Sequence, residues 1–460
     1  MMYARLWQVG LSPGGRRGPC LLLGPMKIVF IAYHFPPDPA VGALRAAHVV
    51  NALQAAGHDV TVITARLPGE RSGRRDAAPG LDVRALRSLP TLRDLYGWVK
   101  RRFGRGRTAQ VGTNPQVQST DWPDRVPGWK RHLSSLLWLL DDRTGFILPA
   151  LLAVLREIRR GVDLIYTTAP PFSAHVVGLT LRRLGGPRWA AEFRDPWTDE
   201  PGKPAHIRSW WSDAADRWLE RQSLRSADHV IAVTDSTCEL LVAKANGADL
   251  ARKAIVVRNG IERLSNGGPR SPRAGPFRIV HVGTFYEWRD PRPFLAGLAA
   301  VILQCGLRPD DLQVDLIGDC RWFHGVSIEQ AAADAGLRDV VRFRDWAPRE
   351  VALQAVTSAD LLLLLAQNQP AAVPNKLYEY LGARIPILAF TDAGGESAAM
   401  LRQAGGHYLV TDHNPVTAVQ VIAQALSETR MSREPVGDEA VLRAWTLERQ
   451  LQRLRAALKV

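Results

Sequence analysis

The chain has 460 residues, of which 46% are hydrophobic and 23% charged, a composition typical of a globular protein with room for two ordinary domains. No stretch approaches the roughly eighteen apolar residues of a transmembrane helix, and the four scattered cysteines form no C-x-x-C pair, which argues against disulfides or zinc and for a reduced, cytoplasmic protein. The net charge of +14 calls for an anionic partner, and because no nucleic-acid-binding module is recognisable, we expect a membrane surface or a lipid phosphate and no nucleic acid.

An α/β pattern begins after an N-terminal extension. Residues 1–25 do not predict a signal peptide, because the apolar run at 20–23 is too short. Since Met26-Lys27 resembles a natural start, we expect residues 1–25 to be an upstream extension or a disordered tail. A strand at 28–33, a helix at 43–56 and a strand at 59–64 then form a βαβ unit. Its loop, HFPPDPAVGALR, contains Gly42 and Arg45 next to the carboxyl end of the first strand, where parallel sheets bind ligands.

Residues 66–130 interrupt this pattern with a basic insertion that is rich in Arg, Gly and Pro and shows little strand pattern. Loops of this length are usually functional or disordered. Within it, LRDLYGWVKRRF (92–103) predicts a basic amphipathic helix of the kind that lies on membrane surfaces. Two alternatives stay open: an insertion that packs on its own domain, or a solvated arginine-rich loop.

Two further strands end in polar residues that we expect at the same edge of the sheet. The strand at 163–167 is followed by His175 on the opening turn of a helix, and the strand at 189–193 is followed by Arg194 and Asp195. Lone histidines are more often structural than catalytic, but a position after a strand favours a functional role. A strand at 229–234 and another at 254–257 complete an N-terminal domain over residues 26–263.

A second α/β domain is predicted for residues 277–430, after a Gly- and Pro-rich linker at 264–276. Its first strand, 278–282, leads into Gly283 and Thr284 and then to Arg289. Later strands fall at 313–317, 340–343 and 360–365. The remaining residues, 431–460, are predicted to be helical and to cross back to the N-terminal domain.

The segment PNKLYEYLGARIPILAF (374–390) follows the apolar strand at 360–365 and ends in a second apolar strand at 385–390, which indicates a sheet buried on both faces. A helix at 375–383 places Lys376 and Glu379 on one face, and its N-terminus suits a phosphate group. The alternative is a solvated surface pair of little energetic consequence.

These segments resemble the family-4 retaining glycosyltransferases of the GT-B fold, in the branch that reads P-x-K-x-x-E-Y-L at its donor site. The resemblance implies an α/β protein with two doubly wound Rossmann-like domains that face each other across a cleft. The chain departs from the family's E-x7-E motif, because Ala371 replaces the first glutamate. The resemblance implies catalytic roles for His175, Arg289 and Lys376, donor contacts from Gly283, Thr284, Arg289, Asn375, Lys376, Leu377 and Glu379, and a cleft lined by Gly42, Arg45, Arg194 and Asp195.

The predicted function is retaining transfer of a sugar from a nucleotide-sugar to a saccharide or lipid-linked acceptor, in cell-surface polysaccharide or glycolipid synthesis. We expect no catalytic metal, because there is no D-x-D motif, and no cofactor beyond the donor substrate. The expected location is the cytoplasm, at the inner face of the cell membrane. Two alternatives stay open: a GT-B sugar-nucleotide epimerase, or a non-catalytic partner subunit.

Overall fold

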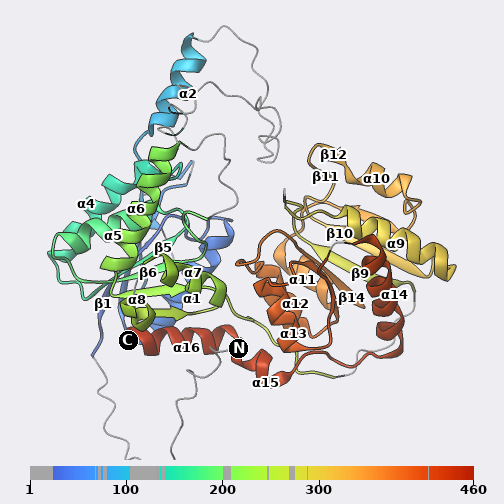
Figure 1. The fold of residues 1–460 in the computed structure, drawn as a ribbon. Helices are drawn as coiled ribbons and strands as arrows, with labels where there is room; N and C mark the ends of the chain where they lie inside the picture. The colour runs from blue at the N-terminus through green and yellow to red at the C-terminus, as the bar shows by residue number, and fades with distance from the viewer. Residues whose placement is uncertain are drawn as a thin grey trace, which may run out of the picture.

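The chain folds into two α/β domains, each built on a sheet that is covered by helices on both faces (Figure 1). The computed structural model describes residues 24–67, 69–70, 74–75, 80–103, 132, 135, 140–199, 209–245, 248–268, 275–286, 288–412 and 414–460. The predicted extension before residue 24, most of the insertion beyond residue 103 and the middle of the predicted linker lie outside these residues. No helix in the described part is long and apolar enough to cross a membrane.

The N-terminal domain contains an eight-stranded sheet in the order β3-β4-β2-β1-β5-β6-β7-β8. All neighbouring strands are parallel except the short β3, which is antiparallel to β4. The strands are β1 (Lys27–Ala32), β2 (Asp59–Ala65), β3 (Arg74–Arg75), β4 (Asp82–Leu86), β5 (Leu164–Ala169), β6 (Arg188–Phe193), β7 (His229–Ala232) and β8 (Ala254–Val256).

Side chains of this sheet alternate between two hydrophobic cores, as expected for strands buried on both faces. From β1, Ile28 and Phe30 enter one core, whereas Val29 and Ile31 enter the other. The helices of this domain are α1 (Val41–Ala55), α2 (Leu92–Phe103), η2 (Thr144–Phe146), α4 (Ile147–Ile158), α5 (Ser173–Arg183), α6 (Trp210–Ser226), α7 (Asp235–Lys244) and α8 (Ala248–Lys253).

The C-terminal domain contains a six-stranded parallel sheet in the order β13-β10-β9-β14-β15-β16. Its strands are β9 (Phe277–Val282), β10 (Leu312–Ile317), β13 (Val341–Arg344), β14 (Leu361–Ala366), β15 (Ile387–Thr391) and β16 (Tyr408–Val410), and a separate hairpin pairs β11 (Trp322–Phe323) with β12 (Val326–Ser327). Its helices are α9 (Arg292–Cys305), α10 (Ile328–Asp334), α11 (Arg349–Thr357), α12 (Asn375–Ala383), α13 (Glu396–Ala404) and α14 (Pro415–Met431).

The chain passes between the domains twice, and the two passages lie side by side. The N–H of Ile261 donates to the carbonyl of Trp445 at 2.8 Å, and the N–H of Leu447 donates to the carbonyl of Ile261 at 2.9 Å. After α15 (Glu439–Ala444), helix α16 (Leu447–Leu458) lies under the N-terminal domain (Figure 1). Its Leu454 and Leu458 are buried in the same core as Ile28 and Phe30, so the last helix belongs structurally to the first domain.

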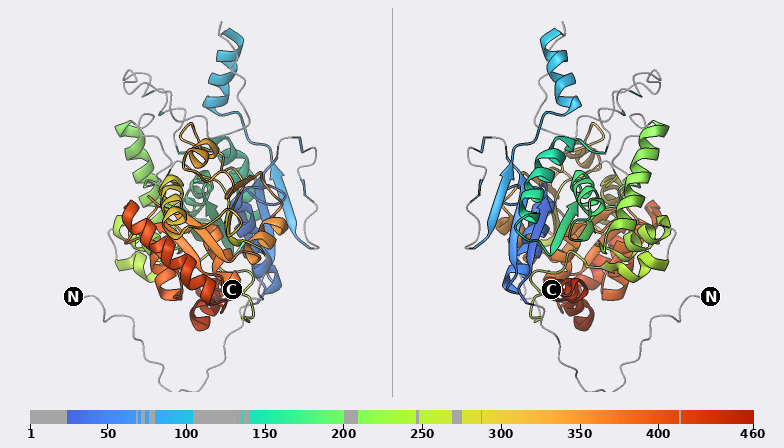
Figure 2. Two further views of the ribbon diagram at one scale, coloured as in Figure 1. Left: turned by 90° about the vertical axis from the view of Figure 1, so that its right-hand side faces the viewer. Right: turned by 90° about the vertical axis from the view of Figure 1, so that its left-hand side faces the viewer.

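Within residues 66–130, where the sequence shows little strand pattern, the structure has the two-residue β3 and a strand at 82–86 that the sequence did not predict. This segment, DVRAL, forms β4 and pairs with β2 inside the sheet, with Val83 and Ala85 buried. Only two of its side chains face inward, because the strand lies near the edge of the sheet, so its apolar signal is short. The predicted amphipathic helix is present as α2, which projects beyond the body of the domain in both views of Figure 2.

Candidate functional site

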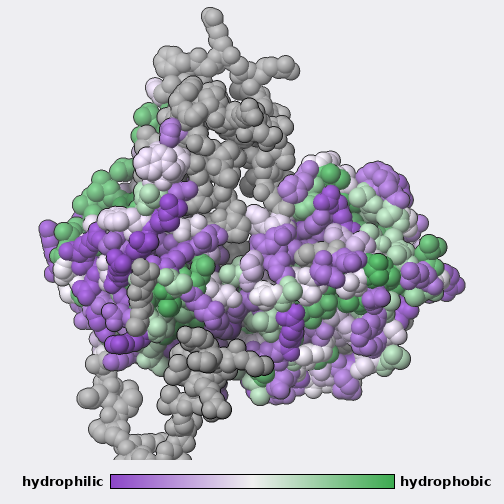
Figure 3. Space-filling model, viewed as in Figure 1, coloured by the Kyte–Doolittle hydropathy of each residue, from purple (hydrophilic) through white to green (hydrophobic). Residues whose placement is uncertain are grey.

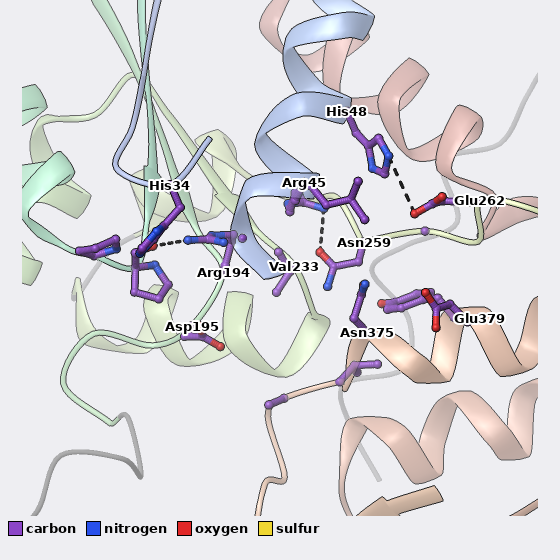
Figure 4. Close-up of a pocket in the computed structure, with 18 residues that line it drawn as sticks. His34, Arg45, His48, Arg194, Asp195, Val233, Asn259, Glu262, Asn375 and Glu379 are labelled. Atoms are coloured by element: carbon purple, nitrogen blue, oxygen red, sulfur yellow. Dashed lines mark hydrogen bonds and ion pairs between the residues drawn. The ribbon is translucent and has the colours of Figure 1, made fainter. Parts of the chain in front are cut away.

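A cavity of about 370 Å³ lies between the two domains. Its N-terminal wall comes from α1 and from loops at the carboxyl ends of strands, and its C-terminal wall includes the first turns of α12 (Figure 4). Of the predicted site residues, it brings together Gly42, Arg45, Arg194, Asp195, Asn375 and Glu379. Lys376 belongs to α12 but does not line the cavity, and neither do Gly283 and Arg289, which follow β9 in the same domain. Leu377 is buried in the core beneath this helix, and Thr284 is partly buried next to Gly283.

Arg289 and Lys376 form a pair of cations without a carboxylate partner among the described residues. Among the described residues, the Arg289 side chain donates only to the side-chain oxygen of Gln369, at 3.3 Å, and its Nε is buried without an acceptor. Burial, reinforced by the nearby Arg289 guanidinium, lowers the pKa of Lys376 to about 7. Buried cations that lack a counter-ion are costly to the fold, so this arrangement suits an anionic ligand that supplies the missing charge.

His281 fixes the position of the Lys376 ammonium. Its Nδ1 lies 2.9 Å from the carbonyl oxygen of Leu363, and its Nε2 lies 3.3 Å from Nζ of Lys376. Burial, followed by the charge of Lys376, holds the pKa of His281 well below its usual value, so the ring is neutral. Since Nδ1 then donates to the carbonyl, Nε2 is the acceptor that orients the ammonium.

Gly283 makes room for this ammonium. Its φ of +137° falls in the region that favours glycine, and a Cβ there would collide with Nζ of Lys376. Gly318 in turn approaches the carbonyl of Gly283 closely. The backbone after β9 and the Lys376 side chain therefore lie in close contact.

Glu379 lines the cavity from α12 and shares an arginine with the N-terminal side of the cleft. Nη2 of Arg349 lies 3.3 Å from Glu379 and 2.8 Å from Glu262. Glu262 also faces His48, at 3.9 Å (Figure 4). The Glu379 carboxylate retains capacity for further hydrogen bonds from a ligand, because Arg349 occupies only one of its oxygens.

Arg45 is held in a structural role. Its guanidinium contacts Glu192 at 2.8 and 3.1 Å, donates to the carbonyls of Val257 and Arg258, and reaches the side chain of Asn259 at 3.1 Å. Burial acts against the ionised form of Glu192, but Arg45 outweighs it and the pKa of Glu192 is lowered. Because the N–H groups of Arg45 already donate to protein acceptors, Arg45 shapes the cavity wall and is not available to bind a phosphate.

Gly42 and Arg194 form a close contact at the other side of the cavity. A Cβ on residue 42 would overlap the Arg194 guanidinium, so a larger residue there would require the Arg194 side chain to move. Arg194 donates to the carbonyls of Ala169 and Pro170, and Asp195 lies beside it in the cavity wall (Figure 4). Burial raises the pKa of Asp195 and lowers that of Arg194. Arg194 forms no ion pair within hydrogen-bond distance among the described residues.

His175 lies in the core of the N-terminal domain and away from the cavity. It is completely buried, its Nδ1 lies 2.8 Å from the Thr167 hydroxyl, and the rings of Phe172, Phe193 and Trp197 surround it. Burial lowers its pKa to about 3, which keeps it neutral. The expected catalytic contact is therefore replaced by a packing role, because the aromatic residues after β6 close over the ring.

Several interdomain contacts were not predicted from the sequence. Glu396, at the start of α13, accepts from Arg258 at 2.7 Å and from the Ser236 hydroxyl at 2.8 Å at the first turn of α7. The carbonyl of Ala371, where the family motif has glutamate, accepts from the Thr234 hydroxyl at 2.8 Å. The G-G-E sequence (394–396) predicts the start of α13, but it does not show that Glu396 contacts Arg258 and Ser236 of the other domain.

The described residues contain no group of three or more His, Cys, Asp or Glu side chains that could hold a metal ion. The chemistry available at the site comes from side chains and backbone: two cations and a glycine turn on one domain, and a glutamate, an arginine and polar loops along the cleft.

Comparison with known proteins agrees with this architecture. Residues 42–260 match the family described as "Glycosyl transferase 4-like domain", which covers most of the N-terminal domain. No protein of curated function matches the sequence.

Solved structures match over nearly the whole chain. A sucrose-phosphate synthase from Thermosynechococcus elongatus has a TM-score of 0.62 at 16% identity, covering 94% of this chain and 98% of the other. Anabaena HepE in complex with UDP-glucose has a TM-score of 0.58 at 14% identity, covering 94% and 99%. A trehalose-phosphate synthase from Burkholderia vietnamiensis has the same score, identity and coverage. At these identities the likeness concerns the fold, and it confirms the predicted one: two Rossmann-like domains in the GT-B arrangement.

Proposed function

We propose that the protein is a glycosyltransferase that takes a sugar from a nucleotide-sugar bound mainly by the C-terminal domain and transfers it with retention of anomeric configuration. The observation that carries this proposal is the Arg289 and Lys376 pair. Both cations are largely buried, neither has a carboxylate partner among the described residues, and Lys376 lies in the first turn of α12. A diphosphate would supply the missing charge and accept from the helix N-terminus as well.

The same pair provides the chemistry. As the glycosidic bond breaks, negative charge grows on the departing diphosphate, and fixed cations in a water-poor site stabilise that charge most in the transition state. Glu379, three residues after Lys376 on the same helix face, accepts hydrogen bonds from the ribose hydroxyls. Anabaena HepE, with the same fold, binds UDP-glucose and UDP, which supports a nucleotide-sugar as ligand of this architecture. Retention and the lack of a catalytic metal rest on the resemblance to family-4 enzymes.

The acceptor enters from the N-terminal domain, and we propose that it is presented at the inner face of a membrane as a lipid-linked saccharide or growing polysaccharide. Support comes from α2, where Leu92, Leu95, Tyr96 and Trp98 are exposed on a helix that also carries Arg93 and Arg102. Hydrophilic residues dominate the N-terminal domain on the face shown in Figure 3. An exposed apolar stripe flanked by cations suits the surface of an anionic bilayer.

A nucleotide-sugar panel tests the donor part of the proposal. A bound donor should raise the melting temperature of the wild-type protein, since a ligand that binds only the folded state stabilises it. Lys376→Met and Arg289→Gln should lose that shift. If no nucleotide-sugar stabilises the wild-type protein, the proposed function is wrong and the partner-subunit alternative gains support.

The membrane part has its own test. Because β4 lies within residues 66–107, deleting that whole segment would damage the sheet, so point variants in α2 are cleaner. Leu95→Asp with Trp98→Asp should reduce co-sedimentation with anionic vesicles, while the exposed control Leu303→Asp on α9 should not. Equal sedimentation of both variants with the wild type would contradict membrane docking through α2.

A further inference from the structure

A second cavity, of about 580 Å³, lies wholly within the N-terminal domain. Its walls come from segments that directly follow three adjacent parallel strands: Tyr33 and His34 after β1, Arg66 and Leu67 after β2, and Arg87 and Ser88 after β4. This is the edge at which open α/β sheets bind ligands. His34 lines both this cavity and the one between the domains, so the two share a wall.

Three arginines line this second cavity, and two of them have no counter-ion within it. Arg66 and Arg87 form no ion pair with any described residue, and Nε of Arg66 is buried without a hydrogen-bond acceptor. Arg143 lies 3.2 Å from Asp142 and stacks over the Tyr33 ring at 5.3 Å. A buried guanidinium donor without an acceptor is costly, which indicates that a ligand supplies one.

The acidic side chains of the cavity do not neutralise Arg66 or Arg87. Asp38 lies 2.7 Å from Nδ1 of His34 and also accepts from the N–H of Ala40 at 2.9 Å. Glu70 accepts from the N–H of Leu67 at 2.8 Å. Glu70 therefore holds the loop that carries Arg66, and Asp38 holds the loop that carries His34.

We propose that this arginine-lined cavity binds a phosphoryl group of the acceptor substrate, with the acceptor's reacting hydroxyl reaching past His34 into the cavity between the domains. The inference rests on the proposed glycosyl transfer and narrows its acceptor class. Three guanidinium groups offer more hydrogen-bond donors than the two oxygens of a carboxylate can accept. A terminal phosphoryl group has three acceptor oxygens and a charge of about −1.5 to −2, so it can use more of these donors. The planar fork of arginine matches such oxygens in pairs.

The phosphoryl group can belong to a soluble sugar phosphate or to a lipid phosphate. In both cases the arginines of the cavity would bind the same phosphoryl oxygens. The position of α2 does not decide between them, although α2 follows Ser88 by only a few residues. The experiment therefore uses one probe for each source, together with a nucleotide probe for the donor site.

Calorimetry on the full chain tests the inference with inorganic phosphate, glucose 6-phosphate and UDP, and sedimentation tests it with phosphatidic acid vesicles against phosphatidylcholine vesicles. The variants are Arg66→Gln, Arg87→Gln and the double variant, each checked by thermal melts. Arg159→Gln, an exposed arginine at the end of α4 outside both cavities, is the matched control.

The wild type and the control should bind phosphate and at least one phosphoryl probe, with affinity that falls as salt rises. Each single variant should lose about tenfold or more, the cost of one charge-assisted contact, and UDP binding should be unchanged in all proteins. Loss for glucose 6-phosphate assigns the soluble source, and loss for phosphatidic acid vesicles assigns the lipid source.

Two results would overturn the inference: no binding of any phosphoryl probe by the wild type, or equal binding by the wild type and the double variant. The UDP measurement distinguishes a failure of the phosphoryl-site inference from a failure of the proposed glycosyl transfer. If UDP binds normally while the arginine variants behave as wild type, the donor site stands and the acceptor site does not. If UDP does not bind but the variants lose phosphate binding, the cavity is an anion site and the glycosyl-transfer proposal fails.

Discussion

Binding of a nucleotide-sugar should be coupled to protonation of Lys376. In the free protein, burial and the neighbouring Arg289 hold its pKa at about 7, against an ordinary value of 10.5. A bound diphosphate supplies the missing negative charge and returns the pKa toward that ordinary value. The complex then holds a protonated lysine over a pH range in which the free protein increasingly loses the proton, so affinity must fall as pH rises above 7.

The size of the effect follows from these values. At pH 8 the free lysine is protonated in about one molecule in ten, so binding should take up about 0.9 proton per donor molecule. Between pH 7 and pH 9 the protonated fraction of the free protein falls from about one half to about one hundredth, which corresponds to roughly a fiftyfold loss of affinity. The neighbouring groups do not contribute to the proton uptake between pH 7 and pH 9. His281 is neutral over this range, and burial raises the pKa of Cys320 to about 12.

Calorimetry with UDP-glucose, or with the donor that a nucleotide-sugar screen selects, measures both quantities when it is repeated in buffers of different ionisation enthalpy. Neither phosphate of a nucleotide-sugar titrates in this range, so the proton uptake belongs to the protein. Lys376→Arg keeps a charge that does not titrate near neutral pH and should bind without proton uptake, whereas Lys376→Met should bind weakly at every pH. A wild-type affinity that is flat from pH 7 to 9, with no proton uptake, would refute the assignment of Lys376 to the diphosphate.

Three further outcomes are expected. Glu379→Ala should weaken donor binding by roughly ten- to a hundredfold without lowering the melting temperature, because hydrogen bonds to a charged group are worth about 1.5–3 kcal/mol; unchanged binding in calorimetry would remove Glu379 from the donor site. Glu192→Gln should lower the unfolding free energy in urea by about 3–5 kcal/mol, since it leaves Arg45 as an uncompensated buried charge, whereas the exposed control Glu239→Gln should change it little; equal stability of the two variants would contradict the pairing. Prolonged chelation should leave turnover intact, and a complete loss that magnesium restores would show that a metal takes part.

The sequence predicted those parts of the fold whose signal is local. The apolar run of β14 alternates between two cores, with Leu361, Leu363 and Leu365 on one face and Leu362 and Leu364 on the other. A short, unbroken apolar run of this kind is typical of a parallel strand that is buried on both faces. The grouping of Gly283 and Lys376 in one site came from the family resemblance and not from a local signal.

What the sequence could not supply depends on contacts between distant segments. His175 has the right position after a strand, yet aromatic residues from β6 and the loop after it enclose the ring. Arg45 looks available next to a glycine loop, but Glu192, 147 residues away, takes its guanidinium. The short strand β4 was hidden in an arginine-rich stretch, because a strand near the sheet edge needs only two buried side chains.

The most direct test of the central claim is NMR of the anomeric proton during a reaction with the selected nucleotide-sugar, with and without phosphorylated and lipid-linked acceptors. The account predicts that free nucleoside diphosphate is released only when an acceptor is present, and that the sugar in the product keeps the anomeric configuration of the donor. A product of inverted configuration would contradict retaining transfer, and conversion of the nucleotide-sugar into an isomer without any acceptor would show that the cleft performs epimerisation instead.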